Sequence, residues 1–146
     1  MKYLHYKTYL SMIERCEGLE LFRNFFAENE NNKTIDLLDD GDNSCASFVS
    51  NILYINELIK SPHSTVDSTE KDLLDYGWVK FNEINDIKKG DLIIWAKDEN
   101  HNNRHIGICL DNNKCVQNDS KLKKTKVENI NFRKIENLFK YIKKTE

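Results

Sequence analysis

The stretch KKGDLIIWAKDENHNNRHIGICLDNNKCVQN, residues 88–118, decides the fold class of this chain. It holds three short runs in which apolar residues are frequent, at 92–96, 104–110 and 114–118, and polar segments separate them. Runs of this length bounded by Gly, Asp and Asn are typical of β-strands joined by turns. The segment 111–113 has the composition of a hairpin turn, so the last two strands are predicted to be antiparallel neighbours.

A helical pattern precedes these strands and begins at a cysteine. Apolar residues recur at helical spacing after Cys45, and Asp42, Asn43 and Ser44 are all residue types that cap helix N-termini. The pattern therefore predicts a helix that has Cys45 in its first turn and runs to about residue 59.

Helices elsewhere in the first half, followed by antiparallel strands, predict an α+β domain. The tail, 132–143, fits either a helix or an edge strand. The other expected elements are two short helices within 6–28 broken near Gly18, a polar acidic loop over 29–43, and a helix over 68–76 stopped by Gly77.

Composition limits the class of protein. A length of 146 residues is that of one domain, and 39% apolar with 32% charged residues is typical of a folded chain. No run approaches the roughly 18 apolar residues of a membrane span, and the N-terminus lacks the features of a secretory signal. We therefore expect no membrane span and a cytoplasmic or non-classically released protein. The net charge of −2 argues against a nucleic-acid partner.

The four cysteines have irregular spacing and no C-x-x-C pair, so they are expected to be reduced thiols rather than metal ligands. Cys45 differs from the others because a helix N-terminus lowers a thiol pKa and offers free N–H groups to an oxyanion. Thiolate chemistry also needs a base, and His105 is the best candidate. Gly107, the next residue on the same strand face, would leave room for a polar side chain beside the imidazole.

The register of the 111–113 hairpin determines which polar side chain that is. A three-residue turn places residue 117 opposite Gly107, so that Gln117 lies diagonally across from His105. A two-residue turn places Asn118 there instead. Both side chains carry a carbonyl oxygen that can accept an imidazole N–H. Gln117 is the preferred third residue, with Asn118 as the alternative and Asp119 as a further possibility if the strand carries a bulge.

The order of these segments resembles the NlpC-type cell-wall cysteine peptidases, a papain-like family. Asn43-Ser44-Cys45-Ala46-Ser47-Phe48-Val49 stands for D-C-S-G-F-V, residues 89–95 stand for P-G-D-L-V-F-W, and residues 105–117 stand for H-V-G-I-Y-L-G-N-G-K-M-I-H. The resemblance covers about residues 40–120 of an expected single domain, 1–146, and leaves the helices of 1–40 unmatched. It implies a papain-like α+β fold in which a small antiparallel half-barrel packs on the helix of the nucleophile.

The resemblance also implies roles: Cys45 as nucleophile, His105 as general base and Gln117 as the residue that orients the imidazole. It implies a thiol peptidase or amidase that works through an acyl-enzyme, needs no cofactor or metal, and takes a peptide or a peptidoglycan stem as substrate. Ser44, Ala46 and Gln117 stand where the family usually has aspartate, serine and histidine. These departures keep two alternatives open, a catalytically silent peptide- or glycan-binding module and an acyltransferase.

Four acidic residues lie just before the predicted nucleophile: Asp36, Asp39, Asp40 and Asp42. One hypothesis is that they attract a cationic group of the substrate. The alternative is a solvated loop turned away from the cleft.

Overall fold

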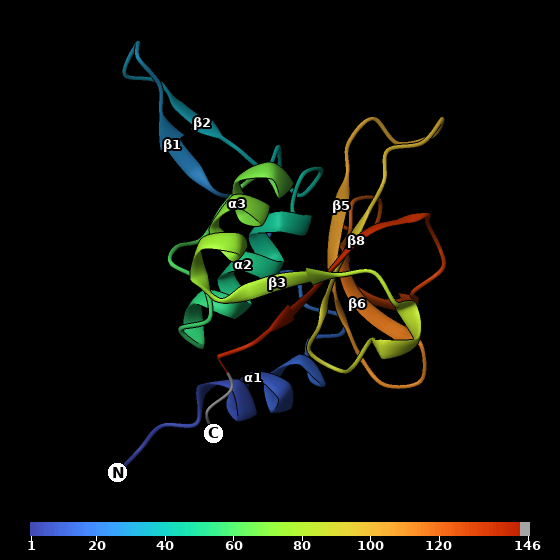
Figure 1. Ribbon diagram of the computed structural model, residues 1–146. Helices are drawn as coiled ribbons and strands as arrows, with labels where there is room; N and C mark the ends of the chain where they lie inside the picture. The colour runs from blue at the N-terminus through green and yellow to red at the C-terminus, as the bar shows by residue number, and fades with distance from the viewer. Residues whose placement is uncertain (144–146) are drawn as a thin grey trace.

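The computed structural model describes residues 1–143. Its helices precede most of its strands, and the sheet occupies the C-terminal half (Figure 1). The elements are α1 (His5–Ile13), β1 (Phe26–Glu28), β2 (Thr34–Asp36), α2 (Cys45–Ile55), α3 (Val66–Tyr76), β3 (Trp78–Phe81), the 3-10 turn η1 (Ile84–Asp86), β4 (Leu92–Trp95), β5 (His105–Cys109), β6 (Lys114–Asp119), β7 (Lys124–Asn129) and β8 (Ile135–Tyr141).

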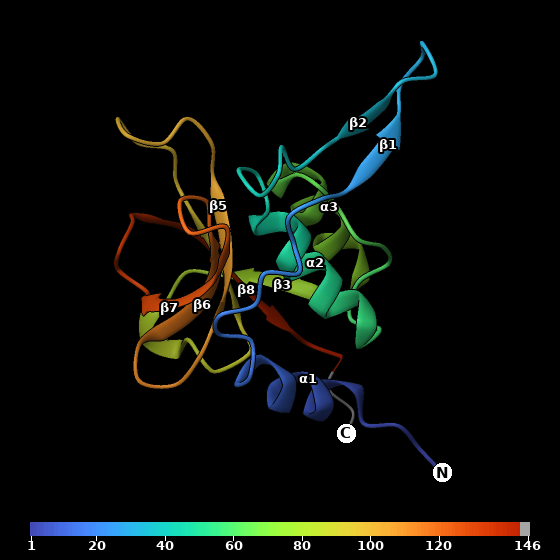
Figure 2. The same cartoon turned by 180° about the vertical axis from the view of Figure 1, so that it is seen from behind.

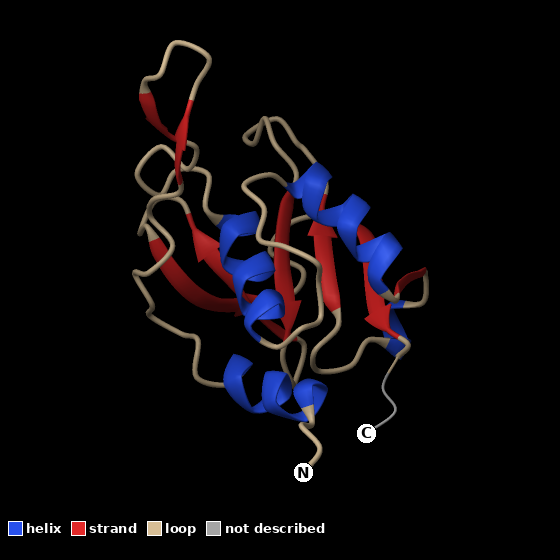
Figure 3. Cartoon of the chain, turned by 90° about the vertical axis from the view of Figure 1, so that its left-hand side faces the viewer, coloured by secondary structure: helices blue, strands red, loops and turns tan. Residues whose placement is uncertain are grey.

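The main sheet has six strands in the order β3-β8-β4-β5-β6-β7, and every neighbouring pair is antiparallel. The helices α2 and α3 lie across one face of this sheet, as Figure 3 shows. A separate two-stranded hairpin, β1–β2, projects away from the body of the molecule (Figure 1). The chain adopts the α+β fold class predicted from the sequence.

Both faces of the central strands are buried, which explains the uninterrupted apolar run in β4. Leu92 and Ile94 belong to the core that α2 covers, whereas Ile93 and Trp95 belong to a second cluster on the other face. Because successive strand residues alternate between faces, a strand that is buried on both sides needs apolar residues at every position.

The two central helices begin and end at identifiable signals. The first residue of α2 is Cys45, as predicted, although the helix stops four residues before the expected end. The helix α3 begins two residues earlier than predicted, because the Thr65 hydroxyl caps it by accepting the Ser68 N–H at 3.1 Å. It ends where predicted, at Gly77, which has a φ of 109° and donates its N–H to Leu73 O.

The second helix predicted within 6–28 is wrong. The backbone after α1 pairs with β7 instead: Gly18 N–H donates to Thr125 O, and Thr125 N–H donates to Leu19 O, both at 2.9 Å. Figure 2 shows this segment running from α1 towards β1. The apolar residues that suggested a helix are used for packing, with Phe22 against Phe48 at a ring-centroid distance of 5.3 Å.

Two other expectations need correction. The polar segment 29–43 is only partly a loop, because β2 lies within it and pairs with β1. The tail forms the strand β8, but this strand lies between β3 and β4 rather than at an edge. The strands β3 and β7 were not predicted. No helix within residues 1–143 is long and apolar enough to cross a membrane.

Candidate active site

Cys45 is the first residue of α2, and hydrogen-bond donors surround its sulfur. The backbone N–H groups of Ala46 and Ile106 donate to it, and His105 forms a side-chain hydrogen bond with it. Burial raises the pKa of the Cys45 thiol, but the charge of His105 and these hydrogen bonds outweigh burial. The net result is a pKa below the ordinary value of a cysteine.

The imidazole of His105 is held from its other side by Gln117. His105 Nε2–H donates to Gln117 Oε1 at 2.7 Å, and Gln117 is buried. Because the amide oxygen can only accept, the neutral imidazole carries its proton on Nε2, and Nδ1 is the nitrogen available to the thiol. The strand register agrees with the three-residue turn, since Ile108 pairs with Val116. Asn118 makes no hydrogen bond to the ring.

Aromatic rings fix the position of His105. The Trp95 ring lies 5.5 Å from it and the Phe132 ring lies 6.1 Å from it, centroid to centroid. A Cβ atom on Gly107 would lie 2.8 Å from the Trp95 indole and 3.0 Å from the backbone oxygen of Val116. The glycine therefore makes room first for Trp95 and not, as predicted, for the polar partner of His105.

A cleft of about 760 Å³ contains both Cys45 and His105. His101, in the loop between β4 and β5, lies at this cleft and bonds to Asp98 at 2.7 Å. Five parts of the chain border the cleft: the segment before α2, the start of α3, the β4–β5 loop, the end of β6, and the start of β8 with the residues before it. Their polar residues at the cleft include Asp42, Ser44, Thr65, Asp67, Lys97, Asn103, Arg104, Asn118, Ser120, Arg133 and Glu136.

Two arginines at the cleft gave no signal in the sequence. Arg104, next to His105, donates to Glu136 and Glu70 at 2.9 Å each and also bonds Asp67. These bonds join the start of α3 and β8 to the strand that carries His105.

Arg133 links the two ends of the β4–β5 loop. It donates to Ala96 O at 2.6 Å and to Asn103 O at 3.0 Å. Only the folded chain brings either arginine to its partners, because they lie about 30 residues or more away in sequence.

The acidic residues before α2 are mostly engaged elsewhere. Asp36 accepts backbone N–H groups of its own loop, including that of Phe25 at 2.9 Å. Asp40 pairs with Arg23 at 3.0 Å, and Asp42 lies 3.7 Å from Lys123. Only Asp42 among the four acidic residues borders the cleft. The structure thus favours the alternative, a loop organised by its own contacts, over attraction of a cationic substrate.

The other three cysteines lie outside the cleft and are buried. Burial raises the pKa of Cys16 to about 11 and those of Cys109 and Cys115 to about 12. Cys109 and Cys115 face one another across β5 and β6 in the second apolar cluster. These thiols are therefore packing residues with little thiolate at neutral pH.

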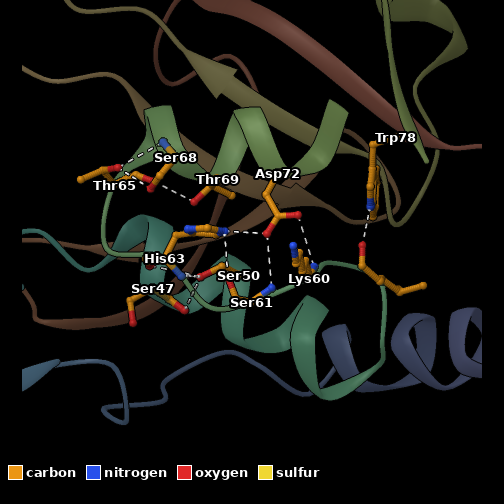
Figure 4. Close-up of polar contacts among 11 residues, drawn as sticks. Ser47, Ser50, Lys60, Ser61, His63, Thr65, Ser68, Thr69, Asp72 and Trp78 are labelled. Atoms are coloured by element: carbon orange, nitrogen blue, oxygen red, sulfur yellow. Dashed lines mark hydrogen bonds and ion pairs between the residues drawn. The ribbon is translucent and has the colours of Figure 1, made fainter. Parts of the chain in front are cut away.

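A second histidine network holds the connection between α2 and α3 (Figure 4). His63 Nε2 lies 2.6 Å from Asp72 Oδ2, and the Ser50 hydroxyl accepts the His63 backbone N–H at 2.8 Å. The same carboxylate accepts the backbone N–H groups of Lys60 and Ser61. This network sets the path of the chain into the start of α3, which borders the cleft.

A thiol at a helix N-terminus, facing a histidine on an antiparallel sheet, places the chain among papain-like α+β proteins. The family model for the NlpC/P60 family matches residues 39–140, and the chain belongs to this family. The match extends beyond the resemblance seen in the sequence and includes β7 and β8. It begins at residue 39, so it leaves α1, β1 and β2 outside.

Among solved structures, the chain is similar to NlpC2 from Trichomonas vaginalis. The identity is 12% and the TM-score is 0.59, over 97% of this chain and 48% of that chain. This chain therefore spans about half the length of that structure, and the likeness concerns the fold. The comparison with curated proteins found no match.

Proposed function

We propose that the protein is a cysteine hydrolase that cleaves amide bonds through a thiol acyl-enzyme. Cys45 is the nucleophile, His105 the general base and Gln117 the residue that orients the imidazole. The observation that carries this proposal is the hydrogen-bonded series Cys45–His105–Gln117 at one end of a helix and inside a cleft. Family membership supports it, since NlpC/P60 proteins are usually cysteine peptidases or amidases of peptidoglycan.

The geometry supports a two-step reaction. The Cys45 sulfur adds to the substrate carbonyl, and its proton passes to His105 and then to the leaving amine. Water, deprotonated by His105, then attacks the thioester and releases the acid. Ser44 makes no side-chain cap, so backbone N–H groups in the first turn of α2 can stabilise the developing oxyanion. Gln117 is neutral and holds the ring without adding charge.

The proposed substrate is a peptide, with peptidoglycan stems as the first candidates. Ser44, Ala46 and Gln117 differ from the usual family residues. Experiments must therefore distinguish the proposed hydrolase from two alternatives, a silent binding module and an acyltransferase. A silent module would show no acyl-enzyme. An acyltransferase would form one and pass it to an amine in preference to water.

The reactivity of Cys45 towards iodoacetamide tests the proposal without knowledge of the substrate. We expect Cys45 to be alkylated selectively, at a rate that rises with pH through a midpoint below that of free cysteine, because the lowered pKa populates the thiolate at lower pH. In His105→Ala burial remains and the favourable interactions are lost, so the midpoint should move to higher pH. The site of alkylation is identified by mass spectrometry.

The three buried thiols are internal controls for this measurement, because their raised pKa values keep them protonated. Equal alkylation of all four cysteines in the folded protein would contradict the proposed role of Cys45. An unchanged midpoint in His105→Ala would show that the histidine does not act on the thiol.

Gln117→Ala should lower kcat by about 10- to 100-fold, because the imidazole then loses the hydrogen bond that fixes its orientation and tautomer. We expect KM to change less than kcat. Gln117→Glu retains an acceptor oxygen and should recover most of the rate, with an altered pH profile because a carboxylate favours the imidazolium. Equal loss in both variants would indicate a packing role only.

A further inference from the structure

Two buried polar side chains at the cleft of Cys45 have no hydrogen-bond partner among the described residues, 1–143. Ser44 and Asn118 are each only 2% exposed, and neither the Ser44 hydroxyl nor either polar atom of the Asn118 amide is bonded. The other buried amide side chains within residues 1–143 are bonded: Gln117 bonds to His105, and Asn56 bonds to Ile52 O. Ser44 and Asn118 lie at the same cleft.

Strand geometry places Asn118 on the side of the helix that carries the nucleophile. Adjacent residues on β6 point to opposite faces, and Gln117 uses the face of His105. Asn118 therefore shares the face of Val116, which packs in the core beneath α2. Ser44 directly precedes Cys45 at the start of that helix. Both unpartnered side chains thus lie in the part of the cleft next to the sulfur.

An unbonded polar group inside a protein is unfavourable, because it has given up its hydrogen bonds to water and has gained none. An apolar side chain of the same size would make the folded state at least as stable. Ser44 also forgoes the usual use of a serine at this position, since its hydroxyl does not cap α2. The presence of two polar side chains without hydrogen bonds beside the nucleophile is explained if the substrate supplies the missing hydrogen bonds.

We propose that Asn118 and Ser44 form a neutral subsite that binds a peptide group of the substrate beside the scissile bond. The Asn118 amide offers one acceptor oxygen and one donor NH2, which match the N–H and C=O of a peptide group. The Ser44 hydroxyl can donate to the peptide C=O or accept from the peptide N–H. The subsite favours an uncharged group because neither residue can compensate a buried charge. The polar atoms are covered in the free protein, so binding includes a local shift of the side chains over them.

This inference rests on the proposed function, because it takes Cys45 as the reacting group. It is tested with two reagents that alkylate the same sulfur. Iodoacetamide has no peptide bond, whereas acetyl-dialanyl chloromethyl ketone presents peptide groups next to its electrophilic carbon. In the second reaction the thiolate forms a C–S bond and chloride leaves with the electron pair of the C–Cl bond.

We expect Asn118→Leu to slow alkylation by the chloromethyl ketone about tenfold and to leave the iodoacetamide rate unchanged. The melting temperature should stay the same or rise, because an unbonded buried amide has been removed. Asn56→Leu is the matched control: Asn56 is equally buried but bonded, so its replacement should lower the melting temperature and leave the ratio of the two rates unchanged. Ser44→Ala should behave like Asn118→Leu with a smaller effect.

A third reagent, a chloromethyl ketone in which an ester replaces the amide next to the electrophile, tests the acceptor role of Asn118. The wild-type protein should prefer the amide reagent, and Asn118→Leu should react with both equally. If Asn118→Leu slows iodoacetamide as much as the chloromethyl ketone, or slows neither, the subsite does not exist.

The failure of the proposed function would look different, since Cys45 would then resist iodoacetamide in the wild-type protein. The subsite is then tested by binding of acetyl-dialanine amide to Cys45→Ala, followed through the NMR signals of the Asn118 side-chain NH2. A shift of those signals supports the subsite, and unchanged signals at saturating peptide overturn it.

Discussion

Cys45→Ala is expected to remove amide hydrolysis altogether, with a loss of at least about 10⁴-fold, because it removes the sulfur that His105 activates to form the acyl-enzyme. The fold should be retained, since Cys45 is only partly buried and the change deletes one heavy atom at a helix end. The measurement is release of amine from peptidoglycan stem peptides. A second measurement is the burst of p-nitrophenol from p-nitrophenyl acetate, which reports acylation independently of peptide recognition.

Two matched variants separate chemistry from structure. Cys16→Ala and Cys115→Ala make the same change at buried thiols, so they should lower the melting temperature and keep the burst. After reaction, the intact mass of the wild-type protein should rise by one acetyl group, and that of Cys45→Ala should not. Amide hydrolysis that survives in Cys45→Ala would refute the assignment of the nucleophile.

The sequence is most informative where a signal is local. The start of α2 at Cys45 could be predicted because cap residues and an apolar stripe meet there. The pairing of Gln117 with His105 could be predicted because a tight turn fixes which residues of two strands are opposite. These two local features identify the thiol and the imidazole with its partner. The contact between Cys45 and His105, which are distant in sequence, was expected only from the resemblance to the NlpC-type family.

Elements that depend on distant partners could not be predicted in this way. The segment that contains Phe22 carries a helical pattern, yet pairing with Thr125 on β7 overrides it. The sequence of β8 fits an edge strand or a helix, and only its insertion between β3 and β4 explains why the adjacent residues Leu138 and Phe139 are both buried. The bonds of Arg104 and Arg133 depend on the same tertiary contacts. These residues border the cleft but belong to no motif.

The role of His105 is tested by a variant whose effect should depend on the leaving group. In His105→Ala we expect amide hydrolysis to fall by about 10³- to 10⁴-fold, because the base that activates the thiol and the acid that protonates the amine are both lost. The burst from p-nitrophenyl acetate should fall far less at high pH, because p-nitrophenolate leaves without a proton and the Cys45 thiolate still forms there. His101→Ala is the control, since it removes an imidazole from the cleft that forms no bond to the sulfur. Equal loss on both substrates at every pH would mean that His105 maintains the site rather than transfers protons. A burst that returns with rising pH, while amide hydrolysis does not, follows from a histidine that serves as base for the thiol and as acid for the leaving amine.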